Sequence, residues 1–161
     1  MSEMFGTIVV NAPYSVALDA LERRLRAKKN RLTLSVPLKA LGLGGSFGLE
    51  QEVSVHFVSF RGHKGERRLH DEMQLTWDPT GGVPFPSFKG ALKMHPLGSD
   101  TEMELNGEYT PPLGAVGEVF DAVIGKKIAE VTANALLGEL KEAIEVDFAA
   151  VKDTIEKTPP G

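Results

Sequence analysis

The stretch Leu105–Glu145 reads LNGEYTPPLGAVGEVFDAVIGKKIAEVTANALLGELKEAIE. It begins with a strand end and is broken by Pro111-Pro112, which cannot extend a strand's hydrogen-bond ladder. The longest helical pattern of the chain follows, with apolar side chains every three or four residues: Val116, Phe120, Ile124, Ile128, Leu136, Leu140, Ile144 and Phe148. Thirty-odd helical residues span on the order of 45 Å, enough to cross a sheet diagonally. We therefore expect a long C-terminal helix packed against a sheet formed by the preceding residues.

The preceding residues are typical of strands separated by short turns. A first strand is expected at Phe5–Val10, followed by a helix that Pro13 opens and that ends around Lys29-Asn30. Five longer strands follow, at Arg31–Leu41, Leu49–Phe60, Arg67–Trp77, Phe85–His95 and Thr101–Tyr109. Because the turns between them are short, successive strands should be antiparallel neighbours, and Pro37 favours an edge strand or a bulge. The fold class predicted is α+β, a curved antiparallel sheet of about six or seven strands around one long helix.

A single register makes three of these strands agree on which face is apolar, the condition for a one-sided sheet. It pairs Trp77 with Phe88 and Tyr109, Leu75 with Gly90 and Gly107, Met73 with Leu92 and Leu105, and Asp71 with Met94 and Met103. The strand at Leu49–Phe60 joins this face only with an odd loop or a bulge near Val58. Gly90 and Gly107 then lie side by side, where they should leave a dimple and permit a sharp bend. The helix could sit in this dimple or leave it open.

Composition excludes several functions. The 161 residues are most simply one domain, residues 1–161, with 42% hydrophobic residues, 25% charged residues and a net charge of −4. This charge disfavours nucleic acid, which requires a basic surface, although Arg23–Arg31 is rich in Lys and Arg. No cysteine is present, so disulfides and thiolate sites are excluded. No apolar run reaches the ~18 residues of a membrane span and no signal peptide is apparent, which favours the cytoplasm.

No motif for catalysis or metal binding is apparent. The histidines His56, His63, His70 and His95 lie at no metal-ligand spacing, and no serine occupies a nucleophile elbow. The glycine-rich Gly42–Gly48 lacks both the Lys-Ser/Thr ending and the helix of a phosphate loop, so a long hairpin is the better interpretation. We expect neither a metal nor a cofactor.

The order of elements resembles the helix-grip fold of the START/SRPBCC superfamily. The residues that carry the resemblance are TWDP at Thr76–Pro79, FPSFKGAL at Phe85–Leu92, LNGEYTPPLGAVGEVFD at Leu105–Asp121 and IAEVTANALLGEL at Ile128–Leu140. They are most similar to polyketide cyclase and coenzyme Q-binding members. The family usually has two short helices and seven strands, whereas one helix and about six strands are expected here. The resemblance implies a fold more than a function, because the superfamily includes lipid carriers, receptors, cyclases and oxygenase domains.

The function expected is binding or transport of a small hydrophobic ligand, lipid-like or aromatic, in a cavity between sheet and helix. The expected lining is Phe57, Asp71, Met73, Trp77, Phe88, Leu92, Met94, Met103, Tyr109, Phe120 and Ile124. Asp71 is the unusual member, since a carboxylate on an apolar face must be paired, wet or protonated, or turned outward by a bulge. With Tyr109 it could instead serve a cyclase-like enzyme, and a third alternative is an interaction module with a filled core. Leu43 and Phe47 could make transient membrane contact or pack over the sheet.

Overall fold

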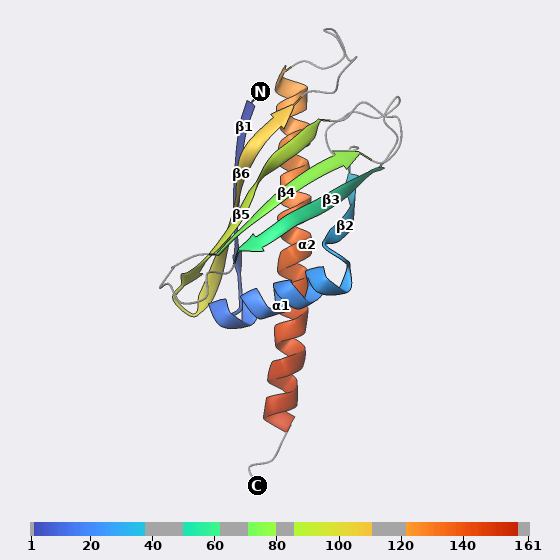
Figure 1. Ribbon diagram of the computed structural model, residues 1–161. Helices are drawn as coiled ribbons and strands as arrows, with labels where there is room; N and C mark the ends of the chain where they lie inside the picture. Colours follow the sequence, from blue (N-terminus) through green and yellow to red (C-terminus); the bar gives the residue numbers. More distant parts are fainter. Residues whose placement is uncertain (1, 38–49, 62–70, 80–85, 111–121, 158–161) are drawn as a thin grey trace.

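The computed structural model describes residues 2–37, 50–61, 71–79, 86–110 and 122–157. Its elements, in chain order, are β1 (Ser2–Val10), α1 (Tyr14–Ala27), β2 (Arg31–Pro37), β3 (Glu50–Arg61), β4 (Asp71–Pro79), β5 (Ser87–Leu97), β6 (Asp100–Thr110) and α2 (Ala122–Lys157). The six strands form one antiparallel sheet in the order β1-β6-β5-β4-β3-β2. The sheet curves around α2, and α1 crosses at one end (Figure 1). The predicted α+β helix-grip architecture is confirmed.

The long helix α2 runs on past the last residue of its predicted stripe. It has 36 residues and ends at Lys157, so it is about 54 Å long. Its C-terminal part extends beyond the sheet and α1 (Figure 1). The predicted start at Val116 lies outside the described residues. No helix in the described part of the chain has a stretch long and apolar enough to cross a membrane.

The register predicted for β4, β5 and β6 is confirmed in every pair. Trp77 pairs with Phe88 and Phe88 with Tyr109, which fixes the remaining pairs of these three strands. A register shift between Phe57 and Ser59 is the predicted bulge at Val58, and it keeps Val55 and Phe57 on the same face as Trp77. β2 lies at an edge of the sheet, as Pro37 indicated.

The core lies between the concave face of the sheet and the buried faces of both helices. α2 contributes four residues of the predicted stripe, Ile128, Leu136, Leu140 and Ile144, and also Leu137, Ala129 and Ala133. Among the described residues, the buried polar side chains are Thr101 and Thr132. Each hydroxyl donates to a backbone carbonyl, Thr101 to Ala12 at 2.8 Å and Thr132 to Ile128 at 2.7 Å. Neither threonine therefore leaves an unpaired polar group in the interior.

Two side chains of α2 attach it to the end of β1. Lys141 Nζ donates to the Val9 carbonyl at 2.9 Å and to Glu145 Oε1 at 2.7 Å. Glu145 Oε1 also accepts from the Asn11 backbone N–H at 3.1 Å. Burial alone would raise the pKa of Glu145, but these bonds and the charge of Lys141 outweigh it and lower the pKa below its ordinary value.

Candidate functional site

Eight of the eleven predicted lining residues come together on the concave face of the sheet. All are buried, with at most 4% of the side chain exposed: Phe57, Met73, Trp77, Phe88, Leu92, Met94, Met103 and Tyr109. Alternation along each strand places them there, since every second residue points to the same face. The face is apolar. Among these eight side chains, the polar groups are the Tyr109 hydroxyl and the Trp77 indole N–H.

The aromatic end of this face consists of Trp77, Phe88 and Tyr109, one residue from each of β4, β5 and β6. The rings of Trp77 and Phe88 are stacked, with centroids 4.2 Å apart and planes 18° from parallel. Trp77 Nε1 donates to the Pro86 carbonyl at 3.1 Å. A buried indole needs such an acceptor, and the bond fixes the ring position that the stacking requires.

Gly90 and Gly107 pair directly, as predicted, but the expected dimple is not empty. A Cβ atom at Gly107 would lie 2.7 Å from Phe88 Cζ, and one at Gly90 would lie 2.6 Å from the same atom. The Phe88 ring therefore covers both glycines. The backbone is equally close, because the same Cβ positions fall 2.4 Å from the Lys89 oxygen and 2.2 Å from the Asn106 oxygen. The space beside the two glycines is therefore filled by the Phe88 ring and by the close approach of the two strands.

The two ends of the concave face are covered differently. The methionine end, where Met94 pairs with Met103, lies toward the β5–β6 turn. α1 packs against β5, β6 and α2 near this turn, and the Thr101–Ala12 hydrogen bond joins the start of β6 to the residues before α1 (Figure 1). At the aromatic end, α2 is the only described helix over the sheet.

Three predicted lining residues are less fully described. Asp71 is the first residue of β4, and its backbone pairs with Met94 in the predicted register. The position of its side chain is not described. Ile124 belongs to the first turn of α2, also without a described side chain. Phe120 lies outside the described residues, as do Leu43, Phe47 and the loop Gly42–Gly48.

Among the described side chains, those of His, Asp and Glu lie away from the concave face. His56 is exposed on β3, while His63 and His70 lie outside the described residues. His95 is half-buried, and its Nε2 lies 2.6 Å from Glu102 Oε1. The two are cross-strand partners, so the register could have predicted this contact. Within the described ranges, no His, Asp and Glu side chains group in a way that could hold a metal ion.

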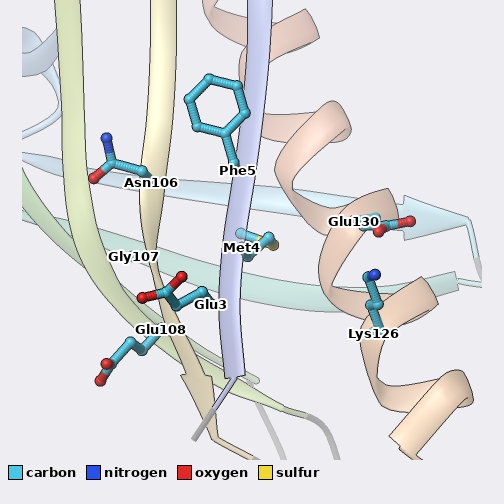
Figure 2. Close-up of a pocket in the computed structure, with 8 residues that line it drawn as sticks. All are labelled: Glu3, Met4, Phe5, Asn106, Gly107, Glu108, Lys126 and Glu130. Atoms are coloured by element: carbon cyan, nitrogen blue, oxygen red, sulfur yellow. The ribbon is translucent and has the colours of Figure 1, made fainter.

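Sequence reasoning missed a groove that involves β1, β6 and the first half of α2 (Figure 2). This acidic trough has a volume of about 610 Å³ and is lined by Glu3, Met4, Phe5, Asn106, Gly107, Glu108, Lys126 and Glu130. Glu3, Phe5 and Glu108 are exposed and alternate with residues of the concave face. The trough forms because the first strand pairs with the last, a pairing that the predicted register did not include.

Comparisons with known proteins agree with this architecture. No protein-family model matches the chain, and no curated protein matches it. A conserved protein from Geobacillus kaustophilus is similar in structure, with a TM-score of 0.54 and 11% identity over 89% of this chain and 95% of that chain. The Zhui aromatase/cyclase from a Streptomyces species gives a TM-score of 0.47 at 13% identity, covering 93% of this chain and 95% of its own.

A START superfamily protein from Mycobacterium smegmatis gives a TM-score of 0.45 at 14% identity, covering 87% of this chain and 97% of that chain. At such identities likeness concerns fold alone. The element order, the antiparallel six-stranded sheet and the long helix held within its curve are those of the helix grip. The chain therefore has the helix-grip fold.

Proposed function

We propose that the chain binds a small hydrophobic ligand between the aromatic end of the sheet and the first half of α2. The observation that carries the proposal is the chemistry of this face. Trp77, Phe88 and Tyr109 form a continuous apolar surface, and the Trp77 N–H is already satisfied by Pro86. Such a surface attracts apolar groups and offers few polar atoms that would orient a charged one.

The helix side of the proposed site is equally apolar. Ile128 is buried and Val131 is partly buried against the core. In the sequence, Phe120 and Ile124 precede them in the predicted apolar stripe. The charged residues of this part of α2, Lys126, Lys127 and Glu130, are exposed. Met73, Met94 and Met103 lie beyond the glycine pair, where flexible thioethers could adjust to ligands of different length.

The test is to purify the protein natively, extract it with organic solvent and analyse the extract by mass spectrometry. The proposal expects an apolar compound in near-stoichiometric amount, released on unfolding. The same protein unfolded and refolded before extraction is the control, because it should carry none. If extracts of native and refolded protein are indistinguishable and added apolar compounds do not bind, the ligand proposal is wrong and an interaction module remains. Conversion of a bound compound that stops in Asp71→Asn would instead favour the enzyme.

A further inference from the structure

The strand β1 forms one edge of the sheet, so half of its backbone groups face away from β6. The Val9 carbonyl is on this free side, because it accepts from Lys141 of α2. Backbone groups of alternate residues point to the same edge of a strand. The N–H and C=O groups of Glu3, Phe5 and Thr7 therefore lie on the free side as well.

The two halves of this edge differ in their hydrogen bonding. The C-terminal half is closed by Lys141 on Val9 and Glu145 on Asn11. In the N-terminal half, no described residue forms a hydrogen bond with the outward backbone groups of Glu3, Phe5 and Thr7. A row of unpaired N–H and C=O groups is a template for another extended chain.

The acidic trough lies at this unpaired half. Glu3 and Phe5 of β1 line it together with Lys126 and Glu130 of α2 (Figure 2). Phe5 is 63% exposed, unusual for a phenylalanine, and offers an apolar contact beside the edge. With Glu108 the trough has three carboxylates and one ammonium group, so it favours a positively charged occupant.

We propose that the N-terminal half of β1 binds an extended, lysine- or arginine-bearing segment of a partner protein, which adds to the sheet as a seventh strand. Backbone hydrogen bonds to Glu3, Phe5 and Thr7 would hold the segment. Its basic side chains would point to the outer face, where they would meet Glu3 and Glu108 and lay their methylene groups beside Phe5. A second copy of this chain fits less well, because pairing β1 with β1 would bring two acidic troughs together. The proposal does not depend on the ligand site, because the segment would pair with the free edge of β1 and not with the buried aromatic residues.

The probe is a fluorescein-labelled peptide of eight residues that alternates lysine with valine, and binding is measured by fluorescence anisotropy at low and physiological salt. The double variant Glu3→Lys/Glu108→Lys should weaken binding at least about tenfold. The matched control is Asp78→Lys/Glu142→Lys, which changes the net charge equally at exposed positions outside the trough. It should change the affinity less than about threefold, the general effect of net charge.

Two N-methylated isomers of the peptide test the strand pairing itself. One is methylated at the lysines and the other at the valines, so only one loses the N–H groups that face β1. One isomer should bind like the parent peptide and the other should lose binding, and the parent should slow amide hydrogen exchange at Phe5 and Thr7. Equal binding by both isomers would mean that the peptide is attracted by charge without strand pairing, and would overturn the proposal. Failure of the parent peptide to bind would overturn it as well. A dimer in sedimentation velocity, with slowed amide hydrogen exchange at Phe5 and Thr7, would assign the edge to a second copy instead.

Discussion

Replacing Gly107 with alanine tests the close approach of β5 and β6 at the centre of the concave face. The new Cβ would lie 2.4 Å from the Lys89 oxygen, 2.5 Å from Gly90 Cα and 2.7 Å from Phe88 Cζ. Two of these three atoms belong to the backbone, so rotating a side chain cannot relieve the overlap. The strands must separate, and the Phe88 ring must also shift from its stack with Trp77. We expect a loss of about 2–3 kcal/mol in the free energy of unfolding, in the range of core overpacking.

The assay is urea unfolding followed by the fluorescence of Trp77, the only tryptophan. With a slope of about 2 kcal/mol/M, the midpoint should fall by about 1–1.5 M. The matched control is Gly138→Ala in α2, where a Cβ would meet nothing within 4 Å. A helix-interior glycine costs stability, so this change should stabilise the protein by about 0.5–1 kcal/mol. If Gly107→Ala unfolds within 0.5 M of the parent protein, the described approach of the two strands is wrong.

Three further predictions concern individual contacts. Thr101→Val should lower the free energy of unfolding by about 1–2 kcal/mol, because the Ala12 carbonyl loses a buried donor at 2.8 Å. Thr101→Ser keeps the hydroxyl and should retain most of the stability, and urea unfolding compares the two variants. Glu145→Gln should be destabilised at pH 7 by about 0.5 kcal/mol. Since the folded pKa lies below the ordinary 4.5, this difference should be present above that pH and disappear as the pH falls through the folded value; an equal difference at pH 3 and 7 would contradict the ion pair. Trp77→Phe should cost about 1–2 kcal/mol by leaving the Pro86 carbonyl without its donor, and unchanged thermal unfolding would show that this bond contributes little.

Alternation predicted much of the sheet because its period is two residues. A slip of one residue would turn Met73 and Leu75 outward, so only one register keeps the apolar face consistent. The same constraint required the bulge at Val58, and the structure has a register shift between Phe57 and Ser59. The stripe of α2 was predicted for the corresponding reason, since its spacing fits only a helix with one buried face.

What fills the space beside Gly90 and Gly107 could not be predicted in this way. Register shows that Gly90 and Gly107 are adjacent, but not that the sheet's coiling brings their backbones too close for any side chain. Whether the Phe88 ring fills the space depends on a rotamer, which the sequence pattern does not encode. Long-range contacts are hidden for another reason. Lys141 and Val9 are 132 residues apart, and no local signal links a surface lysine to an edge carbonyl.

A fluorescence titration of Trp77 with an apolar probe most directly tests whether the aromatic end binds ligand. The protein has one tryptophan, stacked on Phe88, so its emission reports on this end of the face. Long-chain fatty acids and polycyclic aromatic compounds that do not absorb at the emission wavelength should shift or quench the emission saturably. Phe5→Ser, which changes only the exposed outer side of β1, should leave the titration unchanged. If none of these compounds changes the emission while the protein remains folded, the aromatic end does not bind apolar ligands.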